Sequence, residues 1–528
     1  MSRRLLAVLA LTSALFSVLT APASAANRLP RTTVPPAPPP AALAWAPCSP
    51  APEQTFQCAT ISVPKDYLNP TGEQISLALT KIPAQDQANR IGSLLMNPGG
   101  PGGGGVGFVQ AVAGDPGFAT LNQRFDLVGF DPRGVAASTP PIVCLNSAEQ
   151  DAGFANQVPF PTFDAVTGVI ADAQAFAATC QARSGPILPF VSTESAARDL
   201  DQIRQAVGDT KLSYLGFSYG TYLGATYASL FPQNVRALVL DGALDPDEYA
   251  NRPLETDLKQ LGGFDKALHR FLSYCVTECV FGDGDPEAAY DALVARAQAT
   301  PLTSQRDSRP VTGATVLNGT FTALYSRQSW PFLGRALTAA SNGDGTLLQL
   351  AADSYAGRDD TGQYDNSAAA FNAISCADRA YPTDPKPYER FYARSLKISP
   401  RFGPTFWAAE YNCIAWQAKN SLRFTGPFTF KAPQGTPPVL VVGTTKDPAT
   451  PYKGSIALVK QLGNAQLLTM RGDGHTAFGG NSNCIDFRVE AYLFAAKAIK
   501  TPICTQQATP PEFTNSAGGG YGRFVRVR

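Results

Sequence analysis

A serine in a glycine-flanked turn is the first feature of the sequence that could do chemistry. Ser218 is the centre of Gly216-Phe-Ser-Tyr-Gly220, which follows the β-forming run 212–215 and precedes the helix-compatible segment 221–230. In a strand–turn–helix setting this G-x-S-x-G pattern holds the serine hydroxyl above a sheet, and its glycines leave room for a tight backbone. We therefore predict that Ser218 is a nucleophile, with a purely structural turn as the alternative.

A serine nucleophile needs an imidazole that takes its proton near neutral pH. The chain has only two histidines. His269 lies in a helical pattern, whereas His475 lies in a glycine-flanked loop directly after a predicted strand. The chain order of an α/β hydrolase is serine, then acid, then histidine. This order favours His475 as the general base.

The acid that orients the histidine should follow a strand between the serine and the histidine. Asp447 stands just past the end of the strand that begins at Val439. Its carboxylate would select the histidine tautomer and stabilise the imidazolium. Asp241 and Asp245 follow the preceding strand and remain rivals, and Asp473 is too close in sequence to the histidine to be favoured.

A loop of glycine and proline follows another short apolar strand, in the segment 92–105. Glycines let backbone N–H groups turn inward and approach a substrate closely, as an oxyanion hole requires. A flexible linker and a phosphate loop are the alternatives. A phosphate loop of the Walker type would need Gly-Lys-Ser/Thr, which this loop does not contain.

The elements around these residues predict an α/β-hydrolase fold. Short apolar strands alternate with helical segments, which is typical of a mostly parallel sheet flanked by helices. The alternating runs 60–64 and 74–80 predict antiparallel strands before it. Asp131 and Arg133, at the end of the strand starting at Phe125, are expected to brace loops beside the site. Helical segments dominate from 247 to 431 and predict a large, mainly helical cap inserted before the last two strands.

The chain divides into segments by composition. Arg3 and Arg4, an apolar run and Ala23-Ser-Ala25 predict a signal peptide at 1–25, with an uncleaved membrane anchor as the alternative. The Ser2-Arg-Arg pattern also leaves the twin-arginine export route open. No later segment is apolar enough to span a bilayer. The expected order is signal peptide 1–25, Pro/Ala-rich linker 26–43, core 44–246, cap 247–431, core 432–505 and flexible tail 506–528.

Charge and cysteine content agree with an exported protein. The formal charge of +1 gives no indication of nucleic acid as a partner. Ten cysteines fit an oxidising compartment, and sequential pairing is the simplest framework. A zinc site is a poor alternative because the chain has no C-x-x-C pair and only two histidines. The expected pairs are 48–58, 144–180, 275–279, 376–413 and 484–504.

Taken together, these motifs make the chain similar to the secreted tripeptidyl aminopeptidases and related exported hydrolases of actinobacterial type, which are relatives of prolyl aminopeptidase. The resemblance implies Ser218 as nucleophile, His475 as general base and acid, and Asp447 as orienting acid. It also implies that the backbone N–H groups of Gly99 or Gly100 and of Tyr219 form the oxyanion hole. The motifs that carry the resemblance are Asn97–Gly103, Asp131–Val135, Gly216–Gly220, Asp447–Pro451 and Gly474-His475, with Cys376 and Cys413 beyond them. One departure is Gly134-Val-Ala-Ala-Ser138, where family members often have Gly-Val-Gly-x-Ser.

The function expected from these features is acyl transfer by an exported enzyme without metal or organic cofactor, secreted or held in the cell envelope. A tripeptidyl type of aminopeptidase would need a carboxylate for the substrate's amino group, and Asp378 and Glu410 are candidates, unless they are structural or solvated acids. A carboxylesterase acting on small esters with the same triad is the second hypothesis. A non-catalytic binding protein is the third. The sequence leaves the oligomeric state open.

Overall fold

A ten-stranded mixed sheet organises the molecule in this computed structural model, which describes residues 33–48, 56–155, 166–404 and 410–507. The predicted signal peptide and most of the predicted tail lie outside these residues. The strand order is β1-β2-β3-β5-β4-β6-β7-β8-β9-β10. Strands β1, β2, β3 and β5 pair antiparallel, and all other neighbours pair parallel. The predicted α/β-hydrolase architecture is therefore confirmed.

The strands agree with the predicted apolar runs, with one addition. The short strand β10 pairs parallel with β9, so three strands follow the helical insertion and the prediction of two was incomplete. Three residues with one buried side chain, Cys504, give too short a pattern to detect in sequence. The bounds are β1 Ala46–Pro47, β2 Gln57–Pro64, β3 Gln74–Ile82, β4 Gly92–Asn97, β5 Phe125–Phe130, β6 Leu212–Phe217, β7 Val235–Asp241, β8 Val439–Lys446, β9 Ala465–Asp473 and β10 Ile503–Thr505.

Helices cover both faces of the sheet because successive strand residues point to opposite sides. Leu95 belongs to the hydrophobic cluster shared with α5, α6 and α16, whereas its neighbour Leu94 belongs to the cluster shared with α1, α2 and α17. Both residues are fully buried, as expected for a parallel strand covered on two faces. The helix bounds are α1 Gly105–Val112, α2 Pro116–Asn122, α5 Thr193–Ala206, α6 Tyr219–Leu230, α16 Lys453–Leu462 and α17 Asn483–Ala495.

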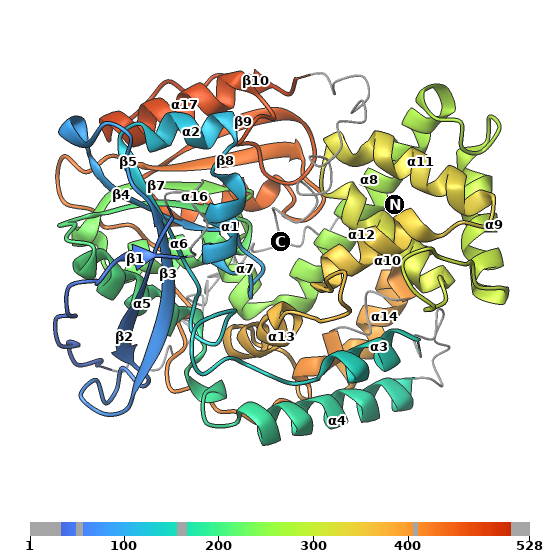
Figure 1. The fold of residues 1–528 in the computed structure, drawn as a ribbon, viewed down its shortest axis with the longest axis horizontal. Coiled ribbons are helices and arrows are strands. Elements are labelled where there is room, and N and C mark those ends of the chain that lie inside the picture. Colours follow the sequence, from blue (N-terminus) through green and yellow to red (C-terminus); the bar gives the residue numbers. More distant parts are fainter. Residues whose placement is uncertain (1–32, 49–55, 156–165, 405–409, 508–528) are drawn as a thin grey trace, which may run out of the picture.

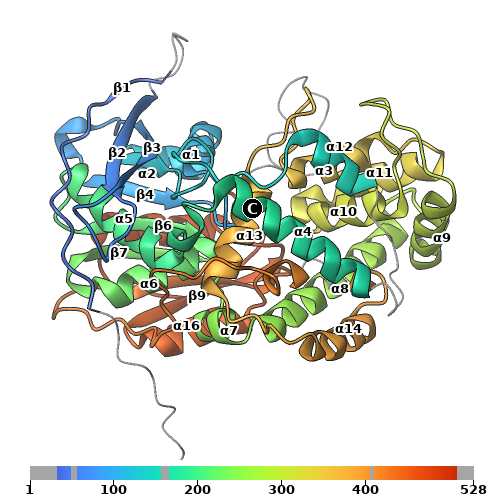
Figure 2. The same cartoon turned by 90° about the horizontal axis from the view of Figure 1, so that it is seen from below.

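The chain between β7 and β8 is mainly helical and forms a cap beside the sheet (Figure 1 and Figure 2). Its own hydrophobic cluster includes Phe264, Phe271 and Leu337, all fully buried. This confirms the predicted helical insertion. Its helices are α7 Pro246–Asn251, α8 Pro253–Glu278, α9 Pro286–Ala299, α10 Gly313–Leu324, α11 Trp330–Ser341, α12 Thr346–Ala356, α13 Ser367–Asp378 and α14 Lys386–Ile398, with the short helices η5 Arg327–Ser329 and η6 Glu410–Cys413.

Two further helices, α3 (Ser147–Ala155) and α4 (Val166–Ser184), lie between β5 and α5. Sequence analysis did not single them out from the core segment 44–246. Ala173 of α4 is buried in the cap cluster, while Cys180 of the same helix is buried in a core cluster. Helix α4 therefore packs against both parts of the molecule.

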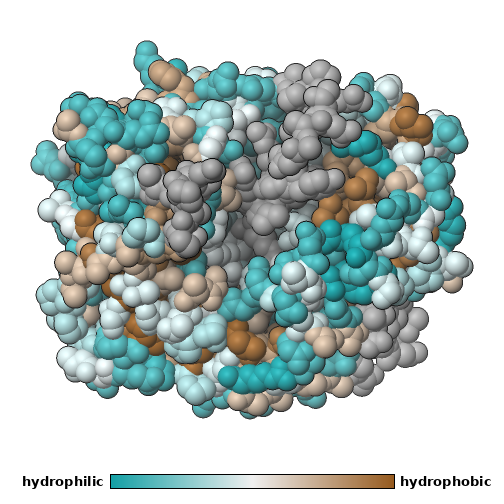
Figure 3. All heavy atoms as spheres, viewed as in Figure 1, coloured by the Kyte–Doolittle hydropathy of each residue, from teal (hydrophilic) through white to brown (hydrophobic). Residues whose placement is uncertain are grey.

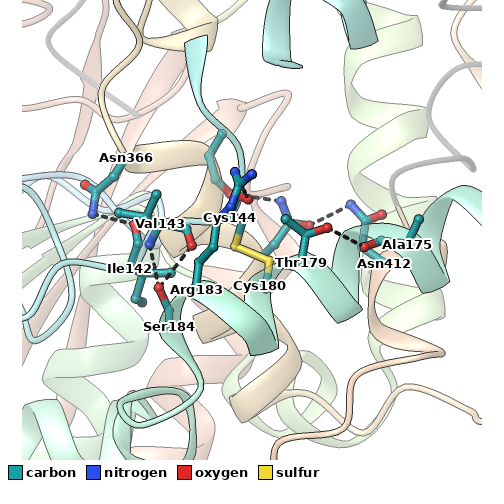
Figure 4. Close-up of a disulfide and its surroundings, with 12 residues drawn as sticks. Ile142, Val143, Cys144, Ala175, Thr179, Cys180, Arg183, Ser184, Asn366 and Asn412 are labelled. Carbon is teal, nitrogen blue, oxygen red and sulfur yellow. Dashed lines mark hydrogen bonds between the residues drawn. A yellow bond between two sulfur atoms is a disulfide. The ribbon is translucent and has the colours of Figure 1, made fainter. Parts of the chain in front are cut away.

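Five disulfides join the ten cysteines in the sequential pairing that we predicted. Figure 4 shows Cys144–Cys180, which joins the loop after β5 to α4. Beside it, Ser184 Oγ accepts a hydrogen bond from Val143 N–H at 2.8 Å. Five disulfides are typical of a protein of an oxidising, extracytoplasmic compartment.

The surface is mixed in character. On the face in Figure 3, hydrophilic residues predominate and hydrophobic residues occur in small groups. Among the helices described, none combines the length and the apolar character that a membrane span needs.

Candidate active site

Ser218 lies at the sharp turn between β6 and α6 and has the strained backbone angles φ 54° and ψ −123°. A Cβ atom on Gly216 would lie 2.5 Å from the carbonyl oxygen of Gly220, and one on Gly220 would lie 2.9 Å from the carbonyl oxygen of Asn97. Larger residues at these two positions would therefore push the turn apart. The Ser218 N–H donates to the carbonyl oxygen of Asp241 at 2.9 Å, which ties the turn to β7.

His475 and Asp447 form a buried pair at the ends of β9 and β8. His475 Nδ1 lies 3.0 Å and 2.9 Å from the two carboxylate oxygens of Asp447, and both side chains are fully buried. The carboxylate also accepts hydrogen bonds from the backbone N–H groups of Ala449, Thr450 and Thr476. These contacts fix the acid, and the acid fixes the orientation of the imidazole ring.

The second ring nitrogen of His475 is left for proton transfer. Nε2 is buried and has no hydrogen-bond partner among the described residues. Ser218 Oγ is therefore not within hydrogen-bonding geometry of it in this structure. Catalytic hydrogen bonds of this kind often tighten only when a substrate binds. A Cβ atom on Gly242, just after β7, would lie 3.0 Å from His475 Cε1. The ring therefore lies against the sheet edge next to the strand that holds Ser218.

The cap contacts the histidine directly. The backbone N–H of His475 donates to the backbone carbonyl oxygen of Tyr325 at 2.7 Å. The side-chain rings of the two residues meet edge to face, with 5.6 Å between their centroids. Ser326 also forms an isolated bridge with Gly474. The turn after α10 thus helps to hold the loop that carries the imidazole.

The rival residues have other partners. Asp245 caps α7 by accepting from Glu248 N–H at 3.1 Å, and Asp473 pairs with Arg270 and Lys446. His269 is exposed on α8, with Nδ1 2.7 Å from Glu287. These contacts hold Asp245, Asp473 and His269 in interactions outside the His475–Asp447 pair.

Asp241, at the end of β7, holds the backbone of the loop that follows His475. Its carboxylate accepts hydrogen bonds from the backbone N–H groups of Ala477, at 2.9 Å, and Phe478, at 2.8 Å. Burial raises the pKa of this carboxyl to about 7, although the same two N–H groups oppose the shift. Asp241 is therefore a structural brace whose charge is disfavoured in the folded protein.

Asp241→Asn should change how stability depends on pH. The pKa of Asp241 in the folded protein lies above the value of 3.8 for a free carboxyl. The raised pKa therefore contributes fully to the free energy of unfolding below about pH 4, and this contribution is lost as pH rises to about 7. Asparagine keeps an oxygen for the two N–H groups but does not titrate. We expect the free energy of unfolding of the variant, relative to wild type, to rise by up to about 4 kcal/mol between about pH 4 and pH 8. Urea unfolding across this range measures it, and parallel pH profiles for the two proteins would contradict the account.

The glycine loop supplies backbone donors beside the serine. The Gly99 N–H donates to Asn97 Oδ1 at 3.0 Å and is therefore already engaged. Within the described residues, the N–H groups of Gly100 and of Tyr219, the first residue of α6, have no such partner. Of the predicted oxyanion donors, Gly100 and Tyr219 are thus the two that remain available.

Asp131 and Arg133 brace the surrounding loops, as predicted. Asp131 accepts from Val106 N–H at 3.0 Å and from Ala137 N–H at 3.1 Å, which links the start of α1, directly after the glycine loop, to the loop after β5. Arg133 is fully buried and pairs with Asp199 of α5. The alanine that departs from the family pattern, Ala136, has φ 46°, so this backbone conformation is kept without glycine.

A cavity of about 550 Å³ lies between the glycine loop and the cap. Its apolar lining includes Phe108 of α1 and Phe332 and Leu350 of the cap, and Tyr325 connects it to His475. Charged side chains lie along its lining on the cap side, namely Arg306, Arg358, Asp359, Asp360 and Asp365. The cavity therefore offers both apolar contacts and ionic partners to a substrate next to the site.

The two predicted amine-binding acids lie differently. Asp378 is buried, and its carboxylate accepts hydrogen bonds from Thr193 N–H at 2.8 Å and Thr193 Oγ1 at 2.5 Å. It is not among the residues that line the cavity. The backbone of Glu410 begins η6, but its side chain lies outside the described structure.

Thr450 is a site residue that sequence analysis missed. Its hydroxyl donates to Asp447 at 3.0 Å and lies 3.2 Å from His475 Nδ1, so it contacts both members of the pair. The signal was present, because a threonine three residues after an aspartate in a proline-flanked turn is typical of a local side-chain turn.

Comparisons with known proteins identify the fold and the family. A model of the α/β-hydrolase fold matches residues 92–277, and a model described as TAP-like protein matches residues 399–501. Serine protease Hip1 of Mycobacterium tuberculosis is 37% identical over 478 residues, covering 85% of this chain and 88% of that protein. Carboxylesterase B of the same species is 38% identical over 450 residues, covering 83% and 84%. Tripeptidyl aminopeptidase of Streptomyces lividans is 33% identical over 474 residues, covering 86% and 84%.

Proposed function

The chain belongs to the TAP-like family of α/β hydrolases, and from this we propose that it is an exported serine hydrolase that releases short peptides, of tripeptidyl type, from free N-termini. The observation that carries the proposal is the buried His475–Asp447 pair, with an unpartnered Nε2, beside the strained turn at Ser218. A serine, an imidazole and a carboxylate in these positions supply the parts of acyl transfer.

In the proposed mechanism, Ser218 Oγ attacks the substrate carbonyl carbon and gives its proton to His475 Nε2. The N–H groups of Gly100 and Tyr219 stabilise the negative oxygen of the tetrahedral intermediate. His475 then protonates the leaving amine while Asp447 stabilises the imidazolium. Water attacks the acyl-enzyme by the same route and releases the acid product.

Three features support a peptide as substrate. The relatives include a serine protease and a tripeptidyl aminopeptidase. The helical cap beside the sheet would block a chain that extends far beyond the scissile bond. In the cavity lining, Asp360 pairs with Arg306, and Arg358 pairs with Asp151 and Asp307 outside the lining, while Asp359 and Asp365 form no ion pair among the described residues. This balance suits a protonated amino group better than an anion.

A carboxylesterase function is the second candidate. A relative of equal similarity is named carboxylesterase B, and the apolar lining formed by Phe108, Phe332 and Leu350 would also accept an acyl chain. The same triad would hydrolyse esters, so the two candidates differ in substrate and not in chemistry.

Chromogenic substrates separate the two candidates. We expect the p-nitroanilide of a free tripeptide to be hydrolysed with kcat/KM at least about 100-fold above that of its N-acetylated form, because acetylation removes the ammonium charge and adds bulk. p-Nitrophenyl esters of short acids serve as the comparison. Turnover of esters with no turnover of any free-amine peptide would overturn the peptidase proposal and favour the esterase.

A further inference from the structure

Helix α13 of the cap lies between the sheet and the cap helices α9, α10, α11 and α12 (Figure 1 and Figure 2). Its buried side chains, including Ala370, Ala373 and Ile374, belong to the hydrophobic cluster of the core and not to that of the cap. The disulfide Cys376–Cys413 and a hydrogen bond from Arg423 Nε to the carbonyl oxygen of Asp378 hold its last turn. The helix therefore packs on the core, and its last turn is tied to the end of the cap segment, between α14 and β8.

The first turn of α13 contacts the glycine loop. A Cβ atom on Gly102 would lie 2.6 Å from the carbonyl oxygen of Ser367 and 2.9 Å from the N–H nitrogen of Phe371, so the loop backbone rests directly on the helix. Just before the helix, Asn366 accepts from Ala136 N–H at 2.9 Å and donates to the carbonyl oxygen of Ile142 at 3.0 Å (Figure 4). This end of α13 therefore sets the position of the loop that contains Gly100.

The last turn of α13 contacts the serine turn through a buried chain of hydrogen bonds. The Tyr219 hydroxyl bonds to Thr193 Oγ1, and that hydroxyl donates to Asp378 Oδ2 at 2.5 Å. The Thr193 N–H donates to the other carboxylate oxygen at 2.8 Å. Since Thr193 Oγ1 gives its proton to the carboxylate, the Tyr219 hydroxyl is the donor of the first bond. Tyr219 is only 4% exposed, so solvent has little access to its hydroxyl to replace this partner.

We propose that α13 aligns the two halves of the oxyanion hole, with Asp378 and Thr193 acting as positioning residues for Tyr219. One end of the helix positions the glycine loop, and the other end positions the residue whose backbone N–H follows the nucleophile. Oxyanion stabilisation depends on donors that are already in place when charge develops, so an error of a few tenths of an ångström at either donor weakens it. The inference rests on the proposed serine hydrolase function, and it gives Asp378 a role different from binding the substrate's amine.

The test uses Thr193→Val, which keeps the side-chain shape but removes the hydroxyl, and Tyr219→Phe, which breaks the first bond only. Tyr227→Phe is the matched control. Tyr227 is also on α6, and its hydroxyl also bonds to a side chain of α5, the carboxylate of Asp201, at 2.8 Å, but more than two turns from Ser218. The readouts are kcat and KM on the best chromogenic substrate, the rate of phosphonylation by a fluorophosphonate, and Tm. Phosphonylation places an oxygen in the oxyanion hole without any assumption about the natural substrate.

We expect Thr193→Val and Tyr219→Phe to lower kcat and the phosphonylation rate by roughly 10-fold to 100-fold with little change in KM. Tyr227→Phe should lower Tm but leave both rates close to those of wild type. Asp378→Asn keeps an oxygen for Thr193 N–H, and its NH2 group can donate to Thr193 Oγ1 with the direction of that bond reversed, so it should retain more activity than Asp378→Ala. Unchanged rates in Thr193→Val, or equal losses in the Tyr227 control, would overturn the inference. Failure of the wild type to be phosphonylated would instead reject the proposed function.

Discussion

Ser218→Ala is expected to lower kcat by about 10⁵-fold to 10⁶-fold on every substrate that the wild type turns over. The hydroxyl is the atom that forms the acyl-enzyme in the proposed mechanism, and the other site groups cannot replace it. Residual turnover would come from the oxyanion donors and from substrate binding. Steady-state kinetics on the chromogenic substrates of the wild type measures the loss, with circular dichroism to verify the fold.

Ser229→Ala is a suitable control for this variant. Ser229 lies on α6, like the residues that follow the nucleophile, but its hydroxyl donates only to the carbonyl oxygen of Ala225 one turn earlier. Its loss should leave kcat within about twofold of wild type, since its hydroxyl bonds to Ala225 and to no site residue among those the structure describes. A Ser218→Ala protein that keeps more than about one hundredth of wild-type kcat would show that Ser218 is not the nucleophile.

Asp447→Asn is expected to lower kcat by about 10⁴-fold while the protein remains folded. The amide can keep one oxygen for the N–H groups of Ala449 and Thr450, but it cannot hold a proton on His475 Nδ1 or stabilise the imidazolium. The ring would then present the wrong tautomer to the serine. Kinetics on the same substrates measures the effect, and KM should change far less than kcat.

Asp473→Asn is the control for this second variant. Asp473 is two residues from His475, but its carboxylate pairs with Arg270 and Lys446 near the surface. Loss of a partly exposed pair costs about 1 kcal/mol or less of stability and should leave the rate nearly unchanged. Equal losses in the two variants would mean that the charge near His475 matters and not the specific contact with Asp447.

The core of the fold was predictable from the sequence, and the candidate reacting groups could be named, because their signals are local. The serine turn, the glycine loop and the strand-end aspartate each occupy fewer than a dozen consecutive residues, and a chain with two histidines leaves little choice of base. Alternation of short apolar strands with helices is likewise visible in sequence, and adjacent cysteines form the pairs that their spacing favours.

What the sequence did not reveal depends on contacts between distant segments. Asp378 bonds to Thr193 across 185 residues, and nothing in the residues around Asp378 indicates that partner. Helix α4 packs against the cap although α5, β6, α6 and β7 separate the two in the chain. The hydrogen bond from Gly99 N–H to Asn97 Oδ1 depends on the geometry of the loop. The sequence alone therefore could not show which of the two glycines, Gly99 or Gly100, has an occupied N–H group.

The most direct test of the account is to map the site of covalent modification. The wild-type protein is treated with a fluorophosphonate, digested with its disulfides reduced, and analysed by tandem mass spectrometry. The account predicts one adduct per chain, on Ser218, formed far more slowly in His475→Ala and absent in Ser218→Ala. An adduct on another serine, or no adduct in a folded protein that still hydrolyses its substrates, would contradict the assignment of Ser218 as the nucleophile.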